Sequence, residues 1–350
     1  MKIAVVGCGI FGSVIAIKLA ENGYSVDVFE KNSKICQAAS TVNQYRVHRG
    51  YHYPRSIDTI KSCIVGESKF RETFKDVLIK DLNSYYAISK YNSYLTSEQC
   101  CNIWDSIDLK YDEIELEYVN YNEIDKVFRV EETLFDGILM NKILLEKLEK
   151  YNINIHFNSK VDKNILEKYD MTIVCTYSNN NDFLSNDLKR NYQFELCEKI
   201  LVKMPQRFIK ESIVVMDGPF MCFDPYSTTP YHLMGNVKHA IHKTDTSNKF
   251  DVPIKYLKYL NSGICNVKNI SNFKKFYDDL NKFFIGVKNT EYIGSMFTVR
   301  TVLPKHEHDD ARPTIVERIN EKQINVFSGK IPTCIDASEM VLDCIANPKL

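Results

Sequence analysis

The first thirty residues alternate between short apolar runs and a stretch with helical spacing. Residues 2–7 (KIAVVG) are apolar and rich in β-branched side chains, which is typical of a buried parallel strand. Val14, Ile15 and Leu19 then recur at intervals that place them on one face of a helix. A second apolar run, residues 25–30 (SVDVFE), ends at an acidic residue. The pattern predicts a strand, a helix and a second strand, which together form a βαβ unit.

The rest of the chain shows two kinds of alternation. Up to about residue 190, and again near the C-terminal end, predicted strands and helices alternate, whereas from about 191 to 297 short strands follow one another as in an antiparallel sheet. Helices are predicted within residues 56–74, 96–107, 131–161 and 324–341. Strands are predicted within residues 83–90, 131–161, 169–178, 198–205, 212–226, 231–237 and 324–341. Two interleaved domains therefore fit the chain better than one.

Length and charge agree with this division and exclude some classes of partner. The chain has 350 residues, and single hydrophobic cores stop growing at roughly 250–300 residues. Lys plus Arg and Asp plus Glu both number 45, so the formal net charge is zero. A balanced charge provides no long-range electrostatic attraction for nucleic acid. We therefore expect a small-molecule partner and no nucleic acid.

The eleven cysteines include no CxxC pair, so the sequence contains neither a zinc motif nor a redox motif. Scattered thiols are typical of a reducing compartment, and we expect a cytoplasmic protein. No segment reaches the roughly 18 apolar residues that a membrane span needs. The apolar N-terminus could pass for a signal peptide, but three spaced glycines interrupt it, so we interpret it as folded structure. The histidines and acids of residues 305–310 (KHEHDD) could bind a metal, but we interpret them as a solvated turn and expect no metal.

The glycines of residues 7–12 (GCGIFG) lie between the first predicted strand and the helix, and this context makes the motif informative. Gly7 permits a tight turn, Gly9 lets the backbone approach a pyrophosphate, and Gly12 allows the helix to pack closely on the strand. The helix N-terminus then presents free N–H groups to the anion. Glu30, at the end of the second strand, can accept hydrogen bonds from a ribose. The unit predicts binding of FAD or NAD, and the acid disfavours the 2′-phosphate of NADP.

A longer pattern distinguishes between these dinucleotides. The spacing GxGxxGxxxAxxLxxxGxxVxxxE is met in full by Gly7, Gly9, Gly12, Ala16, Leu19, Gly23, Val26 and Glu30. This N-terminal unit resembles that of the D-amino-acid oxidase (DAO) family of FAD enzymes, which includes glycine oxidase, sarcosine oxidase and L-2-hydroxyglutarate dehydrogenase. The resemblance implies an α/β fold in which a Rossmann-like FAD-binding domain is interleaved with an antiparallel-sheet α+β substrate domain. The expected FAD-binding domain comprises residues 1–84, 150–190 and 298–350, and the expected substrate domain comprises 85–149 and 191–297.

Residues 43–53 (NQYRVHRGYHY) extend the resemblance. Members related to L-2-hydroxyglutarate dehydrogenase have a run of the type NSGxxHxGxYY, which this stretch matches at Asn43, His48, Gly50 and Tyr53. The resemblance implies that the segment passes along the flavin and that His48 faces the substrate. Gln44, Tyr45 and His52 stand where the family has Ser, Gly and Tyr, which indicates a different substrate.

The resemblance also implies a set of site residues along the whole chain. Those expected to bind FAD are Gly7, Gly9, Ile10, Phe11, Gly12, Glu30, Lys31, Ser40, Thr41, Asn43, Gln44, Val161, Cys175, Thr176, Gly329, Lys330 and Ile331. Those expected to bind substrate are Tyr45, Arg46, Tyr53 and Arg300, with His48 and Arg300 as catalytic residues. Cys175 and Thr176 replace a small-residue turn of the family. No cysteine occurs from 301 to 333, where some relatives attach flavin covalently, so we expect non-covalent FAD.

Structural interpretations of the same residues remain open at this point. His48 could be a core histidine instead of a group that handles a proton near neutral pH. Arg46 could form an ion pair instead of binding an anionic group of the substrate. Tyr53 could pack in a core with its hydroxyl hydrogen-bonded. The sequence alone does not separate these possibilities.

The resemblance leads to one function and two alternatives. We expect an FAD-dependent oxidoreductase that removes a hydride from a C–H bond next to an amine or hydroxyl of a small anionic metabolite, with flavin N5 as the acceptor. FAD supplies the redox chemistry and the protein supplies orientation and charge. Oxygen, a quinone or another acceptor could reoxidise the flavin. The alternatives are an NAD-dependent dehydrogenase with the same glycine motif, and a non-catalytic FAD-binding redox sensor or scaffold.

Overall fold

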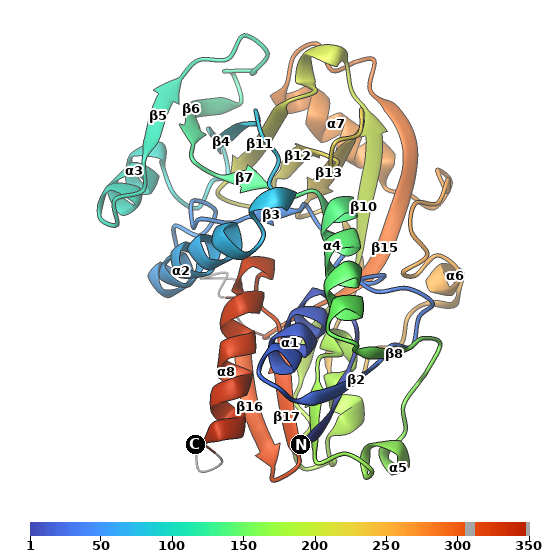
Figure 1. Cartoon of the computed structure of the whole chain (residues 1–350). Coiled ribbons are helices and arrows are strands. Elements are labelled where there is room, and N and C mark those ends of the chain that lie inside the picture. Colours follow the sequence, from blue (N-terminus) through green and yellow to red (C-terminus); the bar gives the residue numbers. More distant parts are fainter. Residues whose placement is uncertain (305–311, 348–350) are drawn as a thin grey trace.

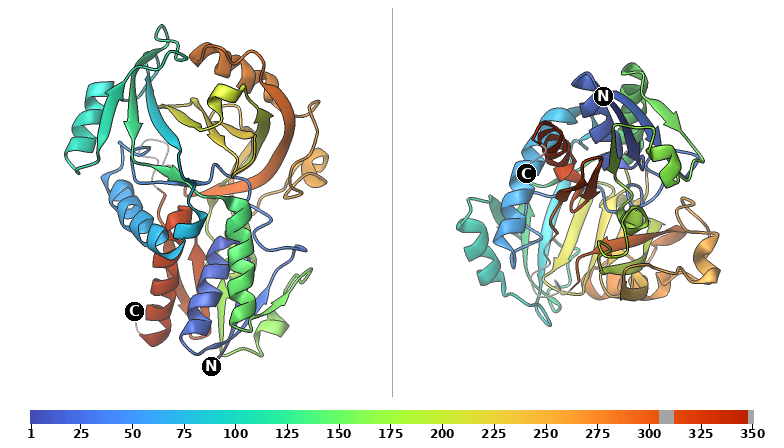
Figure 2. Two further views of the ribbon diagram at one scale, coloured as in Figure 1. Left: turned by 45° about the horizontal axis from the view of Figure 1, so that its top comes forward. Right: turned by 90° about the horizontal axis from the view of Figure 1, so that it is seen from below.

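The computed structural model describes residues 1–304 and 312–347, and the architecture has two parts (Figure 1). The stretch KHEHDD, weighed above as a metal site, lies outside the described residues. Each part is built on its own β-sheet, and the chain passes between the two parts several times (Figure 2). No helix within the described ranges is long and apolar enough to cross a membrane.

The smaller part is a six-stranded sheet in the order β16-β17-β9-β1-β2-β8. Its strands are β1 (Lys2–Val6), β2 (Ser25–Phe29), β8 (Asn154–His156), β9 (Met171–Val174), β16 (Ile315–Asn320) and β17 (Gln323–Phe327). β1 pairs in parallel with β2 on one side and with β9 on the other. β9 is buried throughout, and β1 and β2 are buried apart from their first residues, as expected for parallel strands covered on both faces. The predicted βαβ unit is therefore present.

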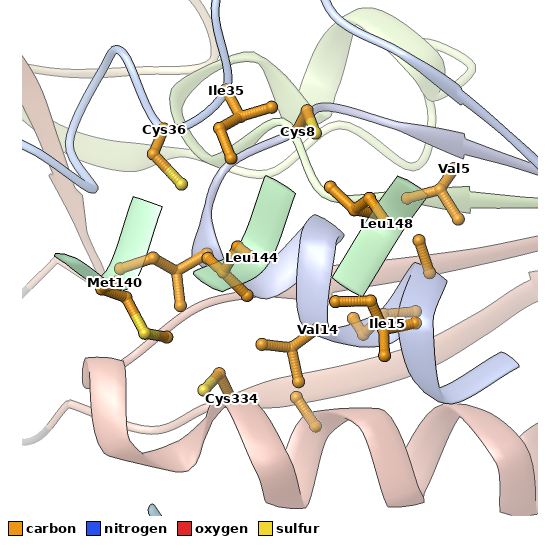
Figure 3. Close-up of a cluster of buried hydrophobic side chains, with 14 of the residues drawn as sticks. Val5, Cys8, Val14, Ile15, Ile35, Cys36, Met140, Leu144, Leu148 and Cys334 are labelled. Carbon is orange, nitrogen blue, oxygen red and sulfur yellow. The ribbon is translucent and has the colours of Figure 1, made fainter. Parts of the chain in front are cut away.

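Three helices pack together beside this sheet. They are α1 (Ile10–Glu21), α4 (Gly137–Lys150) and α8 (Cys334–Ala346). Figure 3 shows Val14 and Ile15 of α1 between Leu144 of α4 and Cys334 of α8, and all four are buried in one apolar cluster with β1. Burial of each such side chain contributes on the order of 1.5–3 kcal/mol. This core fixes the direction of α1, and with it the position of the glycine motif.

The larger part is a nine-stranded sheet in the order β14-β10-β13-β12-β11-β4-β6-β5, with β15 also paired to β10. Its strands are β4 (Asn83–Ser89), β5 (Tyr111–Ile114), β6 (Ile124–Val130), β10 (Tyr192–Lys203), β11 (Glu211–Met216), β12 (Met221–Pro225), β13 (His232–Asn236), β14 (Ile241–Ser247) and β15 (Glu291–Val302). A short two-stranded sheet joins β3 (Arg46–Val47) to β7 (Thr133–Leu134). Most neighbouring strands of the larger sheet run antiparallel, and β4 and β11 form a parallel pair.

The remaining helices are α2 (Ile57–Thr73), α3 (Ser97–Asp105), α5 (Lys163–Leu166), α6 (Ile254–Leu257) and α7 (Phe273–Phe283). α7 has a strongly apolar face, and its Phe276, Leu280 and Phe283 are buried against strands of the larger sheet. α3 begins with a capping box in which Thr96 and Gln99 bond each other's backbone N–H groups, and it packs through Trp104.

The predicted fold class is confirmed, and the structure shifts two of the expected limits between parts. α4 packs on α1, beside the smaller sheet, although the expected limit at residue 150 had assigned it to the substrate domain. β15 continues the larger sheet to Val302, past the expected limit at residue 298. Amphipathic periodicity shows that a helix has a buried face, but it does not show which sheet that face covers. The division into domains remains our proposal.

Candidate active site

The glycine motif forms a tight turn at the carboxyl end of β1. Gly7 has φ +96°, and a Cβ there would lie 2.6 Å from the carbonyl oxygen of Cys175. A Cβ at Gly12 would lie 1.9 Å from the carbonyl oxygen of Gly7. Both positions therefore require glycine, because the helix and the turn after β9 approach the loop this closely. The spacing argument for the motif has a direct geometric basis.

Gly9 faces the segment that follows β2. A Cβ at Gly9 would lie 3.0 Å from the Ser40 hydroxyl oxygen, which accepts a hydrogen bond of 3.0 Å from the Ile10 N–H. The Ile10 N–H is bonded in this way, whereas the N–H groups that follow it in the first turn of α1 have no intrahelical partner, as at the start of any helix. The lack of a side chain at Gly9 and the partial positive charge at the N-terminus of α1 are both favourable for binding a pyrophosphate.

Glu30 is buried directly after β2, and its carboxylate links the glycine loop after β1 to the segment after β2. One carboxylate oxygen accepts a hydrogen bond of 2.8 Å from the Cys8 N–H, and the other accepts from the backbone and side-chain N–H groups of Asn32. Val161 packs in a small cluster with Phe29, the residue before Glu30. These positions agree with the predicted adenosine site, and contact with a ribose stays a prediction.

The turn after β9 closes the loop from the other side. The Cys175 N–H donates to the Val6 carbonyl at 2.8 Å, and the Thr176 N–H donates to the Asn180 side chain at 3.1 Å. Lys31 Nζ donates to Asn179 Oδ1 at 3.0 Å, which links the segment after β2 to the turn after β9. The residues that replace the family's small-residue turn therefore still lie against the glycine motif.

Side chains of the linker after Ser40 stabilise the linker itself. The Thr41 hydroxyl donates to the Cys36 carbonyl, and Asn43 Nδ2 donates to the Ala39 and Ser40 carbonyls at 3.0 and 2.8 Å. Asn43 Oδ1 also accepts from the Tyr45 N–H at 2.7 Å. These bonds fix the path of the segment toward Gln44, and any contact of Thr41 and Asn43 with FAD stays a prediction.

Tyr45 lies in a core and not in a substrate cavity, contrary to the expectation from sequence. Its φ is +55°, in the left-handed region that favours glycine, which is the family's residue at this position. Its ring is 5.2 Å from that of Phe135, and its hydroxyl donates to the Thr41 carbonyl at 2.6 Å. A Cβ at Gly137 would lie 2.2 Å from the Tyr45 ring, so the start of α4 makes room for it. Contact with substrate would require this ring to leave the core.

Arg46 is likewise a structural residue. Its guanidinium is buried and pairs with Glu132 at 3.2 Å and with Asp224 at 2.5 Å, and it also donates to Ser212 at 2.8 Å. The two carboxylates neutralise its charge, so the structure does not support the predicted binding of a substrate anion by Arg46. Glu132 lies between β6 and β7 and Asp224 lies in β12, both far along the chain from Arg46, and sequence analysis identified neither.

His48 shares Glu132 with Arg46. His48 Nδ1 lies 3.5 Å from Glu132 Oε1 and has no hydrogen-bond partner among the described residues. The Glu132 carboxylate accepts hydrogen bonds from the Tyr86 hydroxyl at 2.8 Å and from the Arg49 N–H at 3.0 Å. Burial would raise the pKa of Glu132, but the positive charges of His48 and Arg46 and the N–H of Arg49 hold it at about 2. Burial lowers the pKa of His48, and Glu132 opposes this shift. The result is an ionised carboxylate beside a histidine that is neutral at neutral pH.

Three rings and one amine gather next to this pair. The rings of His48, His52 and Tyr53 lie 5.0–5.7 Å apart, and Lys330 Nζ lies 4.1 Å from the Tyr53 ring centroid. Tyr53 Oη and His52 Nδ1 are buried and find no hydrogen-bond partner among the residues described. Burial lowers the pKa of Lys330 to about 7, and burial together with the charges of His48 and Lys330 lowers that of His52 well below its usual value. The predicted residues His48, Tyr53 and Lys330 therefore form one cluster.

Lys330 is held in place by the turn before α8. A Cβ at Gly329 would lie 2.2 Å from the Arg312 carbonyl oxygen, and the Gly329 N–H donates to the Thr314 hydroxyl at 3.0 Å. Ile331 follows and packs against the core that contains α1. The C-terminal turn is thus a fixed element that brings Lys330 to the segment of residues 48–53.

Arg300 lies on β15 of the larger sheet. It stands directly opposite Glu195 across the β10–β15 ladder, and its Nε donates to Glu195 Oε2 at 2.5 Å. The guanidinium remains partly exposed, with 40% of the side-chain surface accessible. The predicted anchoring role stays a prediction, because Glu195 already balances its charge.

A surface hollow of about 540 Å³ lies beside Glu132 and is bounded by Arg49, Glu131 and Thr133 as well. As far as the described residues define it, the hollow includes none of the residues expected to bind FAD. It is separate from the predicted dinucleotide site.

The residues present fit a bound FAD at both ends. At the predicted pyrophosphate position, any side chain at Gly9 would extend toward the Ser40 hydroxyl, and the start of α1 provides N–H groups. At the other end, Tyr53 Oη, His52 Nδ1 and Gln44 Oε1 are buried polar atoms without a partner in the described part of the chain. Buried polar groups are normally hydrogen-bonded, so a polar ligand explains them. The eleven cysteines are free thiols, and no group of His, Cys, Asp and Glu within the described ranges could hold a metal.

Comparison with known proteins finds relatives that use FAD. A family model described as FAD dependent oxidoreductase (DAO) matches residues 2–96, which include the glycine motif, Glu30 and the segment of residues 43–53. The FAD-dependent monooxygenase kojA of Aspergillus flavus is 27% identical over 255 residues, which cover 64% of this chain and 58% of that protein. The FAD-dependent monooxygenase FPY4 of Fusarium mangiferae is 22% identical over 364 residues, covering 98% and 91% of the two chains. The chain thus spans less than two thirds of the length of kojA.

The fold is similar to that of solved oxidases. Glycine oxidase from Geobacillus kaustophilus superimposes with a TM-score of 0.71 at 13% identity, covering 99% of this chain and 94% of that one. This likeness shows the same fold. The match of the family model confirms the resemblance to FAD-dependent oxidoreductases of the DAO type, with FAD as the cofactor. The NAD-dependent alternative finds no support in these matches.

Proposed function

We propose that this protein oxidises a C–H bond next to an amine or hydroxyl of a small anionic metabolite, with FAD as the acceptor of a hydride. The observation that supports this most strongly is that His48 lies beside the buried Glu132 carboxylate and next to the Tyr53 ring, which in turn contacts Lys330. FAD, when bound, supplies the redox chemistry. Hydride removal also requires a group that takes the amine or hydroxyl proton.

His48 is the residue suited to take that proton. Its Nδ1 faces the Glu132 carboxylate, which leaves Nε2 as the atom that accepts a proton from the substrate. The lowered pKa keeps the ring neutral and ready to accept near neutral pH. Once His48 is protonated, the ionised Glu132 stabilises the imidazolium, and Arg46 keeps Glu132 in position.

Lys330 adds a positive charge to the same cluster. Its ammonium group lies over the Tyr53 ring, and no carboxylate pairs with it in the described ranges. By the family resemblance, the turn of residues 329–331 meets the flavin, so Lys330 would place positive charge next to the group that receives electrons. The remaining predicted FAD-binding residues keep the roles expected from their positions around the glycine motif.

The named relatives support a second candidate. Two proteins that match this chain are called FAD-dependent monooxygenases, and a monooxygenase would use the same dinucleotide site. The two functions differ in the source of electrons, because a monooxygenase that adds oxygen requires an external reductant, whereas the proposed oxidation takes electrons from the substrate.

Anaerobic reduction separates these candidates and also tests for a non-catalytic FAD protein. Purified holoprotein is mixed without oxygen with panels of amino acids, amines and hydroxy acids, in the absence and presence of NADH or NADPH. The proposal expects bleaching of the flavin absorbance by an organic substrate alone. Bleaching only with a nicotinamide nucleotide would support the monooxygenase, and flavin that resists every donor would support a sensor or scaffold.

A further inference from the structure

The short helix α6 exposes two aliphatic side chains to solvent. Ile254 is 87% exposed, the highest value of any large apolar side chain in the described ranges, and Leu257 is 55% exposed. The two residues are three positions apart, so they lie on the same side of the helical turn. Single apolar side chains on a surface are ordinary, but a pair on one turn forms a small apolar tip (Ile254 and Leu257).

The turn that carries the apolar tip is fixed to the larger sheet. Tyr256 is buried, and its hydroxyl lies 2.7 Å from Nδ1 of His242, whose Nε2 lies 2.8 Å from Glu198 Oε2. The Tyr256 ring lies 5.4 Å from the ring of Phe297 in β15. α6 lies at the outer edge of the molecule in the different views (Figures 1 and 2). The sheet therefore holds Tyr256 inward and presents the apolar tip outward.

The segment around α6 is basic, although the whole chain has no net charge. Residues 248–270 contain four lysines and one acidic residue, Asp251. Lys255 and Lys258 each follow a residue of the apolar tip and are exposed. Their amines lie 4.9 and 4.8 Å from the ring centroids of the tyrosines that follow them. Neither lysine forms an ion pair with a described residue, so both offer positive charge next to the apolar tip.

A membrane surface with anionic headgroups fits this combination better than a protein partner does. A specific protein interface buries roughly 800 Å² on each partner, which is more than two aliphatic side chains provide. A bilayer accepts a small apolar insertion, and anionic headgroups attract lysines that lie near the surface. Lysine side chains also extend their apolar stems along the lipid boundary while the amines reach the headgroups.

We propose that α6 docks this protein on an anionic membrane surface, with Ile254 and Leu257 inserted between lipids and Lys255 and Lys258 bound to the headgroups. The contact is peripheral, because the apolar tip is a single turn. It adjoins the linker of the predicted FAD site, since Gln37 Nε2 donates to the carbonyl of Asn261, just after α6, at 3.2 Å. The inference goes beyond the proposed function and does not depend on it.

The test measures sedimentation of the holoprotein with lipid vesicles. One set of vesicles is phosphatidylcholine alone, and the other contains about one third phosphatidylglycerol, each at about 0.1 M and about 0.5 M salt. The parent is compared with the double variants Ile254→Ser with Leu257→Ser, and Lys255→Gln with Lys258→Gln. The matched control is Val65→Ser with Lys61→Gln, which changes an exposed apolar residue and an exposed lysine on α2. FAD content, thermal stability and the mass in solution are recorded for each protein.

We expect the parent to bind the anionic vesicles, more weakly at the higher salt concentration, and to bind phosphatidylcholine least. Replacing the apolar tip by two serines should weaken binding at least about 10-fold. Replacing the two lysines should weaken it about 5-fold per lysine and remove most of the salt dependence. The control on α2 should bind as the parent does, and all variants should keep their FAD.

Four results would overturn the inference. They are a parent that stays in the supernatant with anionic vesicles, a parent that binds both kinds of vesicle alike, and serine variants at positions 254 and 257 that bind like the parent. The fourth is a parent dimer that these two serines convert to a monomer, which would assign the apolar tip to a second copy of the chain. None of these results involves reduction of the flavin, so failure of the proposed function remains distinguishable.

Discussion

Lys330 Nζ lies 4.1 Å from the centroid of the Tyr53 ring, so the turn before the last helix contacts the segment that follows the FAD motif. Such a cation–π contact contributes about 0.5–2 kcal/mol. The two residues are 277 positions apart by their numbering, and the contact closes one side of the cluster that contains His48 and His52.

This contact predicts a pH dependence of stability in the protein without FAD. Burial lowers the pKa of Lys330 from 10.5 to about 7, so between these values the unfolded chain binds more protons than the folded one. The free energy of unfolding should therefore rise with pH across that range. Denaturant titrations of parent and Lys330→Met apoprotein should show a parent-minus-variant difference that increases from about pH 7 upward. If the parent-minus-variant difference in the free energy of unfolding did not change with pH, the lowered pKa of Lys330 would be contradicted.

Gly137 and Tyr45 predict a steric conflict. Alanine normally stabilises a helix relative to glycine by up to about 1 kcal/mol, but a Cβ at Gly137 would meet the Tyr45 ring at 2.2 Å. Gly137→Ala should therefore destabilise the protein by about 1–3 kcal/mol, measured by denaturant unfolding. Tyr45→Gly should relieve the conflict, so the pair of substitutions should be strongly non-additive. Simple additivity would show that Tyr45 does not pack there.

The Arg46 network predicts a large loss of stability. Arg46→Met leaves Glu132 and Asp224 buried without their cation, which costs about 3–5 kcal/mol. Arg49→Met, three residues away, breaks only the exposed pair with Glu131 and should cost less than about 1 kcal/mol. Equal effects of the two substitutions in chemical denaturation would show that the network does not stabilise the fold.

The approach of Gly9 to Ser40 predicts selective loss of the cofactor. Gly9→Val places a side chain where the loop leaves 3.0 Å to the Ser40 hydroxyl, and it should abolish retention of FAD. Far-UV circular dichroism should remain that of the parent, because the core of α1 is unchanged. The flavin-to-protein ratio after purification is the measurement, and a yellow Gly9→Val protein would refute the location of the pyrophosphate.

The sequence predicted the local units well and the long-range charge partners poorly. The glycine motif, Glu30 and the linker could be located because each is defined by spacing within one βαβ unit. Glu132 and Asp224 could not, because their roles depend on contacts with Arg46, which is distant from both along the chain. Tyr45 was assigned to substrate on resemblance alone, and only the backbone φ and the room at Gly137 explain its place in the core.

The central claim is that His48, held by Glu132, takes the substrate proton in an FAD-dependent oxidation. The most direct test is anaerobic stopped-flow reduction of the flavin by the substrate that bleaches the parent. His48→Ala should keep the fold and the FAD content but reduce flavin about 10²-fold or more slowly, whereas His52→Ala should have a smaller effect. If His48→Ala reduces its flavin at the parent rate, His48 is a packing residue and the account is wrong.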